Sequence, residues 1–195
     1  MSAATVTLTP AEYLARERAA NERHEYVGGQ LRHRQGANRH HTLIIVQLAT
    51  VIHRAIAEKP LDGYILDMRV RIPDGPYYYP DAVVAPRPPE LEDAHQDTLL
   101  NPVVVVEVLS PSTEAIDRGE KLDNYRLIPS LTDYLIVFQD RMRVEHYSRM
   151  TADEWRLVTH DGDDAIPLES LGCELRLADV YRRWLVEQQQ SDRNG

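Results

Sequence analysis

Three charged residues stand out by their types and by the apolar segments around them: Asp81, Glu107 and Lys121. Glu107 lies inside the most apolar stretch of the chain, residues 102–109, where burying an unpaired carboxylate would cost several kcal/mol. Glu107 must therefore have a partner. Asp81 belongs to a strand-like segment upstream, and Lys121 belongs to a helical segment downstream. Together the three residues indicate a divalent-metal phosphodiesterase site.

The chemistry open to these residues follows from the requirements of phosphodiester hydrolysis. The reaction requires a nucleophilic water, neutralisation of charge on the scissile phosphate and help for the leaving oxygen. Mg²⁺ serves these needs and prefers oxygen ligands, commonly one or two carboxylates completed by waters and substrate oxygens. Asp81 and Glu107, each near the end of an apolar strand, supply such a pair if the two strands are neighbours. Lys121 could orient the attacking water, lower its pKa or stabilise the charge that develops at phosphorus.

The helical segment that carries Lys121 offers a way to orient its amine. Asp117, Lys121 and Tyr125 are spaced by four residues, so they share one face of a helix. We therefore expect Asp117 to orient the Lys121 amine and Tyr125 to flank it.

The same residues also fit a purely structural role. Glu107 could be a core carboxylate that Lys121 or an arginine neutralises without any metal. Asp81 could merely end a strand. Because two carboxylates and a lysine often occur together by chance, residue types and spacing leave both interpretations open.

Other residues with chemical potential are weaker candidates. His40 and His41 could bind metal or phosphate, but histidines at the start of a helix more often cap it or face solvent, and we expect this of both. Ser110 and Ser112 lack a partnered His and Asp in a recognised order, which argues against a serine hydrolase. The three tyrosines at 77–79 could stack on bases, although we expect them to divide between the core and the surface of a strand.

Periodicity and turn signals predict the elements that must position these residues. Thr9-Pro10 followed by Glu12 is typical of a helix start. The valines of residues 102–109, flanked by prolines, are typical of a buried strand. The order predicts an α/β (α+β) fold with a mixed central β-sheet flanked by helices. We expect helices at residues 10–25, 41–57, 112–128 and 178–190, and strands at 30–35, 64–72, 77–84, 102–109, 133–139, 143–148 and 155–159.

Length and composition bound the kind of protein. With 195 residues, the chain is long enough for one domain, which we expect over residues 1–190 with a disordered tail at 191–195. The longest apolar run is shorter than a membrane span, and the first residues lack the pattern of a secretory signal. The single cysteine, Cys173, excludes an internal disulfide framework and a cysteine zinc cluster. We therefore expect a cytoplasmic protein without a membrane partner.

The charge of the chain is negative overall but unevenly distributed. A net charge of −9 argues against a surface that attracts nucleic acid over its whole extent, since phosphate contacts need clustered Lys and Arg. Between Arg16 and His41, however, arginines and histidines outnumber glutamates. This stretch could meet a polyanion, or it could form a solvated helix face with intrahelical ion pairs, and the residues alone leave the two equally open.

Six ordered blocks of the sequence carry a resemblance to a known family. They are HEYVGG (24–29), GANRHH (36–41), YPDAVV (79–84), VVEVLSPST (105–113), DRGEKLDNYR (117–126) and PSLTDY (129–134). These blocks resemble those of the Uma family of restriction endonuclease-like proteins, in the PD-(D/E)XK nuclease superfamily, and His41 occupies the histidine position of its block. The resemblance covers most of the chain, and it implies a core of a four-stranded mixed sheet flanked by helices.

The resemblance also implies roles for individual residues. Asp81 and Glu107 would be metal ligands, aided by the carbonyl of Val108, and Lys121 would be the catalytic lysine. Glu25 resembles the helical acidic residue that completes the site of the superfamily. One position departs from the family pattern, because the usual lysine two residues beyond the acidic ligand is Leu109 here. The lysine would therefore have to come from the helix, a migration known in the superfamily.

The expected function is a Mg²⁺-dependent endonuclease, with Mn²⁺ as an alternative ion and DNA as the expected nucleic acid partner. Analogy with the superfamily adds a homodimer as the expected assembly. The competing hypothesis is a non-catalytic module that keeps the charges as a buried network while it binds nucleic acid or a protein. The acidic balance and Leu109 favour this second hypothesis.

Overall fold

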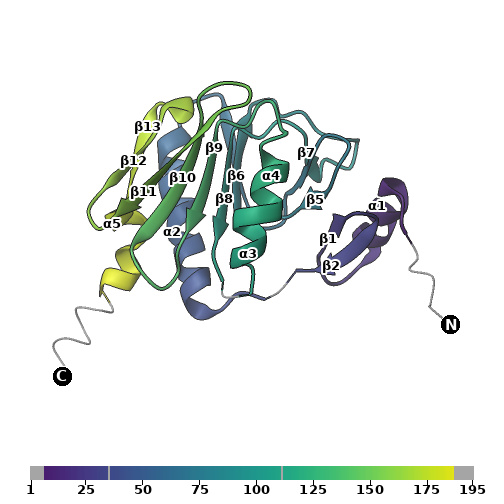
Figure 1. The fold of residues 1–195 in the computed structure, drawn as a ribbon, viewed down its shortest axis with the longest axis horizontal. Helices are drawn as coiled ribbons and strands as arrows, with labels where there is room; N and C mark the ends of the chain where they lie inside the picture. The colour runs from purple at the N-terminus through teal and green to yellow at the C-terminus, as the bar shows by residue number, and fades with distance from the viewer. Residues whose placement is uncertain (1–6, 35, 111, 187–195) are drawn as a thin grey trace.

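The computed structural model describes residues 7–34, 36–110 and 112–186. The predicted helix end at 187–190 and the predicted tail at 191–195 lie outside the described residues. The described part combines a large mixed sheet, helices on both of its faces and a smaller sheet beside it (Figure 1). This arrangement confirms the α+β class predicted from the sequence.

The larger sheet contains the strand that carries Glu107. β8 runs parallel to β9 and antiparallel to β6, so the sheet is mixed, as predicted. Because Ala82 pairs with Val106, Asp81 lies level with Glu107 at the end of the β6–β8 ladder. In order across the sheet, the strands are β11 (Trp155–Asp161), β10 (Arg143–Arg149), β9 (Asp133–Val137), β8 (Val104–Val108), β6 (Ala82–Pro86) and β3 (Leu61–Ile65).

β8 separates two apolar cores, one on each face of the sheet. Its even-numbered valines pack with α2 (Arg39–Ile56), whose buried residues include Ile44, Leu48 and Ile52. Its odd-numbered Val105 belongs to the core on the opposite face, with the helical segment that follows β8. Because side chains of a strand alternate, Glu107 points toward that same segment.

The helical segment after β8 is one continuous run with a wider turn at its centre. It consists of α3 (Glu114–Ile116), a π-helical turn (Asp117–Lys121) and α4 (Leu122–Tyr125). Its position confirms the helix predicted at residues 112–128. In Figure 1 this segment lies in front of the large sheet, while α2 lies behind it. A wider π turn of this kind occurs frequently at functional sites.

The N-terminal helix begins as predicted but ends earlier. α1 (Pro10–Ala19) starts with a capping box, in which the Thr9 side chain and the Glu12 side chain each bond the other's backbone N–H. The predicted end near Glu25 is wrong, because residues from His24 onward form a strand. The backbone of Ala20 is already extended, so the helix ends before it. The N–H of His24 then donates to the Glu17 carboxylate.

The smaller sheet is formed largely by that strand and its neighbours. β1 pairs with β2 in a hairpin, confirming the predicted strand at 30–35, and the turn uses Gly28 and Gly29 at φ of 57° and 82°. Glycine suits both positions because a left-handed backbone is costly for other residues. The strand order is β2 (Gln30–His33), β1 (His24–Val27), β5 (Tyr77–Tyr78), β4 (Arg69–Arg71) and β7 (Thr98–Leu99).

Two predicted strands are wrong because the chain crosses between the sheets within them. Residues 64–72 divide between β3 and β4, and residues 77–84 divide between β5 and β6. Leu66 interrupts the first with a φ of 68°, which is not extended backbone. Pro80 interrupts the second because it has no N–H to donate to a ladder. Asp81 therefore lies in the bend before β6.

The C-terminal region contains a hairpin that the sequence did not predict. β12 (Ala165–Leu168) pairs with β13 (Cys173–Arg176), and α5 (Leu177–Val180) follows directly. The predicted strands around 133–139, 143–148 and 155–159 are confirmed as β9, β10 and β11. Cys173 is half-buried against the core. Across the described ranges, no helix has the length and apolar character needed to cross a membrane.

Candidate active site

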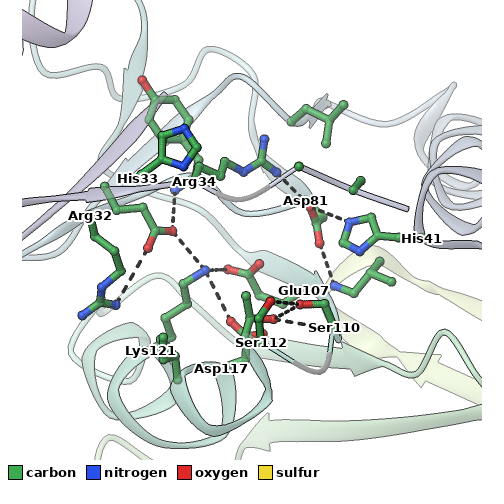
Figure 2. A pocket seen from close by; sticks show the side chains of 18 of the residues that line it. Arg32, His33, Arg34, His41, Asp81, Glu107, Ser110, Ser112, Asp117 and Lys121 are labelled. Atoms are coloured by element: carbon green, nitrogen blue, oxygen red, sulfur yellow. Dashed lines mark hydrogen bonds and ion pairs between the residues drawn. The ribbon is translucent and has the colours of Figure 1, made fainter. Parts of the chain in front are cut away.

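A pocket of about 580 Å³ opens where the two sheets and the helical segment after β8 meet. Its lining includes every residue predicted for the site, namely Glu25, Asp81, Glu107, Val108 and Lys121. These side chains come from the small sheet, the bend before β6, the end of β8 and the π-helical turn. Figure 2 shows the charged groups converging on one another in this pocket. The fold thus brings together residues that lie far apart in the sequence.

Glu107 lies at the floor of the pocket with only 4% of its surface exposed. Its Oε1 accepts hydrogen bonds from Lys121 Nζ at 3.0 Å and from the Tyr125 hydroxyl at 3.0 Å. Burial raises the pKa of Glu107 to about 8. The Lys121 ammonium acts in the opposite direction, and the nearby carboxylates of Asp117 and Asp81 raise the pKa further. The charged form of Glu107 is therefore disfavoured at this buried position.

Lys121 is surrounded by carboxylates from three elements. Its Nζ lies 3.0 Å from Glu25 Oε1, 3.0 Å from Glu107 Oε1 and 3.4 Å from Asp117 Oδ1. Burial alone would lower the pKa of Lys121, but the three carboxylates outweigh it and raise the pKa well above its ordinary value. Lys121 is therefore an ammonium ion. The contacts with Asp117 and Tyr125 agree with the one helix face expected from the spacing of four.

Asp81 is held at both carboxylate oxygens. Its Oδ2 accepts a hydrogen bond from the backbone N–H of Val108 at 2.8 Å. Its Oδ1 lies 2.9 Å from an Arg34 guanidinium nitrogen and 3.3 Å from His41 Nε2. Burial would raise the pKa of Asp81, but these hydrogen bonds and charges together lower it below its ordinary value. Asp81 is therefore a carboxylate within this pocket.

Glu25 reaches the site from a strand and not from a helix. It lies on β1, so the helical setting expected for this residue is wrong. The pairing of β1 with β2 and β5 replaces the last turns of the predicted helix. From this position Glu25 still contacts the Lys121 amine, and its other oxygen lies 4.0 Å from Arg32.

Sequence reasoning missed two residues of the site, Arg34 and His41. His41 was expected to cap its helix or to face solvent, but its side chain is 12% exposed and contacts Asp81. Arg34 was part of the basic stretch and had no assigned role. The signal that could have found them is the cluster of arginine and histidine directly before and within the start of the helix at 41–57.

Other basic residues of that stretch form ion pairs within the molecule. Arg32 bonds both oxygens of Glu120 at 2.9 and 2.8 Å, and Arg18 bonds Asp93 and Asp97. These pairs join different elements, so the alternative of a helix face with intrahelical ion pairs is wrong for Arg18 and Arg32. Both arginines are nevertheless paired within the molecule. The tyrosines at 77–79 are all buried, so none is exposed for stacking on a base.

The hydroxyl groups beside the pocket do not form a serine nucleophile. Ser110 Oγ lies 3.0 Å from Ser112 Oγ and 3.0 Å from Thr113 Oγ1. A Ser nucleophile is activated by a general base within hydrogen-bond reach, most often a histidine. The Ser110 hydroxyl contacts other hydroxyls at this position.

The donor set of the pocket fits a hard divalent cation. Asp81 and Glu107 offer carboxylate oxygens, and Asp117 has a buried oxygen, Oδ1, without a hydrogen-bond partner although Lys121 lies 3.4 Å away. Among the described residues, no group of three or more His, Cys, Asp or Glu side chains is arranged to hold a metal ion. Mg²⁺ does not require such a group, since one or two carboxylates with waters and substrate oxygens complete its octahedron.

Comparison with known proteins connects this architecture to nucleases. A crystal structure described as a "putative nuclease belonging to DUF820" from Anabaena variabilis ATCC 29413 is similar, with a TM-score of 0.71, 17% sequence identity and coverage of 91% of this chain and 98% of that one. This likeness shows a shared fold.

The sequence comparisons extend over nearly the same region. Two uncharacterized proteins of Synechocystis sp. (strain ATCC 27184 / PCC 6803 / Kazusa) are similar, sll1609 at 35% identity over 84% of this chain and 93% of its own length, and slr1290 at 32% over 90% and 92%. The family model described as "Uma2: Putative restriction endonuclease" matches residues 10–179. The chain therefore belongs to the Uma2 family of restriction endonuclease-like proteins.

Proposed function

We propose that this protein is a Mg²⁺-dependent endonuclease that hydrolyses phosphodiester bonds in DNA, with Mn²⁺ able to replace Mg²⁺. The observation that carries the proposal is the convergence of Asp81, Glu107, Lys121 and Glu25, all buried, on one open pocket. Membership of the Uma2 family and the nuclease-like fold support it.

Asp81 and Glu107 are the proposed metal ligands, with the carbonyl of Val108 beside them. The N–H of Val108 donates to Asp81, and the N–H and C=O of one strand residue point to the same side of the strand. The Val108 carbonyl therefore faces Asp81. A divalent ion bound there supplies charge stabilisation at phosphorus and lowers the pKa of water.

Lys121 acts in this proposal as a cation and not as a base. Because its pKa lies well above the ordinary value, Nζ keeps its protons. It can donate a hydrogen bond to a phosphoryl oxygen and stabilise the charge that develops there. Glu25 and Asp117 hold the amine in position from two sides.

Cleavage of plasmid DNA by the purified protein tests the proposal. We expect nicking or linearisation with Mg²⁺ or Mn²⁺, none with EDTA, and loss of activity in Asp81→Asn and Lys121→Gln. Lys59→Gln is a matched control, because Lys59 bonds the carbonyls of Leu171 and Gly172 away from the pocket. Wild-type protein that cleaves neither DNA nor RNA with either ion would contradict the proposal.

One observation favours the alternative of a non-catalytic binding module. Each charged residue of the site already has a charged partner, with Lys121 set against Glu25 and Glu107 and with Asp81 set against Arg34. If this charge network needs no metal ion, the protein would bind DNA or a protein partner without cutting DNA. In that case the protein would retain DNA in EDTA, and Asp81→Asn would leave retention unchanged.

The proposal also covers the partner, the compartment and the assembly of the protein. Nucleic acid is the proposed partner, in the cytoplasm, and a homodimer is the proposed assembly by analogy with the superfamily. A single folded domain over residues 1–190 likewise remains a prediction. Light scattering after size exclusion would establish the assembly directly.

A further inference from the structure

Arg34 and His41 reach the same oxygen of Asp81 from two different elements. Arg34 follows β2, and its backbone N–H donates to the Arg23 carbonyl at 2.9 Å. His41 lies in the first turn of α2, where its backbone N–H donates to Asn38 Oδ1 at 3.0 Å. Both side chains point to Asp81 in Figure 2, at 2.9 Å and 3.3 Å from Oδ1. Two backbone anchors thus hold an arginine and a histidine over one carboxylate oxygen.

This arrangement occupies Oδ1, one of the two Asp81 oxygens that a metal ion could bind. A carboxylate offers about four lone-pair directions, and at Asp81 three are used, one by Val108 N–H and two by Arg34 and His41. An ion bound to Oδ1 would lie about 2.1 Å from it, within close range of the guanidinium. Repulsion between the two positive charges makes these states exclusive. Metal bound at Asp81 Oδ1 therefore requires the Arg34 side chain to leave.

The pocket has room for the Arg34 side chain to move away from Asp81, and its carboxylates explain why a phosphodiester would need that side chain. Arg34 lines the cavity of about 580 Å³, and its side chain is 22% exposed, so the guanidinium can swing while its backbone stays anchored. A phosphodiester entering this cavity meets the carboxylates of Glu25, Asp117 and Glu107. The phosphodiester therefore needs a cationic side chain in addition to Lys121, whose ammonium already faces all three carboxylates.

Of the cationic side chains that line the pocket, that of Arg34 is best placed to bind the phosphodiester. Arg32 is bound at both nitrogens by Glu120, and Lys121 is shared among three carboxylates. Arg34 instead pairs with Asp81, a proposed metal ligand, and it contacts the single oxygen Oδ1. A guanidinium is also the side chain that best matches the geometry of phosphate oxygens.

We propose that Arg34 and His41 hold Asp81 while the site lacks its divalent ion, and that they bind a non-bridging oxygen of the phosphodiester once the ion takes Asp81 Oδ1. This inference rests on the proposed function, because it requires a metal ion at Asp81. It assigns Arg34 opposite effects on two ligands. Arg34 competes with the metal ion, and it assists the nucleic acid.

The test measures the two ligands separately. Mn²⁺ is titrated calorimetrically without DNA, and a fluorescent oligonucleotide is titrated in Ca²⁺, which serves as a probe ion for binding. We expect Arg34→Gln to bind Mn²⁺ at least about fivefold more tightly, since coupled ligands typically shift each other by that factor or more. We expect the same variant to bind the oligonucleotide about tenfold more weakly, as for a lost hydrogen bond to a charged group.

Three further variants separate this role from a merely structural one. Arg34→Lys keeps the charge but not the guanidinium fork, so its Mn²⁺ affinity should stay near the wild-type value while oligonucleotide affinity falls. His41→Gln should follow Arg34→Gln in direction with smaller effects. Arg32→Gln is the matched control, because Arg32 lines the same pocket and pairs with Glu120 instead of Asp81. It should leave Mn²⁺ affinity unchanged.

The outcomes distinguish this inference from the proposed function. If the wild-type protein binds Mn²⁺ and Arg34→Gln binds it equally or more weakly, the exchange of partners is wrong while the metal site stands. If the wild-type protein binds no Mn²⁺, the metal site is wrong and the exchange falls with it. If Arg34→Gln does not fold, His41→Gln must show the tighter Mn²⁺ binding, and its failure to do so overturns the inference.

Discussion

Glu107 and Lys121 have unequal energetic roles although they form one ion pair. The Glu107 carboxylate is buried among other carboxylates, and its raised pKa of about 8 shows that its charge is disfavoured there. Lys121, by contrast, is the cation that faces three of those carboxylates. Removing the acid therefore relieves repulsion, whereas removing the lysine leaves buried acids without a partner.

This asymmetry predicts opposite stability effects for two nearly isosteric changes. Lys121→Met should lower the free energy of unfolding by about 3–5 kcal/mol, as for breaking a buried pair, and Glu107→Gln should change it by less than about 1 kcal/mol. Urea denaturation without divalent ions measures both. Lys59→Met is the matched lysine control, since its partners are backbone carbonyls. Equal losses for both site variants would show that the pair, and not the lysine, stabilises the fold.

At the scale of elements, the strands β9, β10 and β11 contain a second buried polar group that the pocket does not use. His146 on β10 bonds Asp133 on β9 at 2.7 Å, and the ring of His160 on β11 lies 5.9 Å from His146. His160 Nε2 is buried without a hydrogen-bond partner. Burial and the neighbouring His146 lower the pKa of His160 below its ordinary value, although Asp164 and Asp161 raise it. This position therefore favours the neutral imidazole.

The lowered pKa of His160 predicts a loss of stability in weak acid. A histidine that is neutral in the fold but protonated when unfolded stabilises the protein above its unfolded pKa of about 6.5. That contribution is lost as pH falls from about 6.5 toward the lower pKa of the folded state. Urea midpoints between pH 7.5 and 5.5 should therefore fall less steeply in His160→Gln than in the wild type. Parallel curves for the two proteins would show that His160 is protonated equally in both states.

The boundaries of elements show where local patterns decide the fold and where they do not. The capping box at Thr9 and the valine run of β8 were predicted correctly, because both depend on neighbours within a few residues. The crossings at Leu66 and Pro80 were missed, because the apolar alternation continues through them. Which sheet accepts each half is decided by partner strands elsewhere in the chain.

For the whole molecule, the net charge is −9, and Arg18 and Arg32 are paired with carboxylates. Contact with nucleic acid is therefore not expected over the whole surface. The candidate site residues lie between two sheets, so binding of an ion at the proposed metal site is coupled to folding. A ligand that binds only the folded state stabilises it by mass action.

Metal binding should consequently raise the melting temperature of the protein. At one hundred times the Kd, Mg²⁺ should add about 2.7 kcal/mol to the free energy of unfolding. Differential scanning calorimetry with Mg²⁺, and with NaCl at equal ionic strength, measures the gain. Asp81→Asn should abolish it. A wild-type melting temperature that does not change when Mg²⁺ or Mn²⁺ is added would favour the non-catalytic module.

The sequence by itself determined that Glu107 needs a partner, and it identified Lys121, Asp117 and Tyr125 as one helical face, because strand alternation and helix periodicity are local properties. It also predicted a mixed sheet from the order of elements. Only the tertiary structure decided that Glu25 reaches Lys121 from a strand, and that Arg34 and His41 meet at Asp81. Those contacts depend on how β1, β2 and α2 pack against the end of β8, and no local pattern encodes that packing.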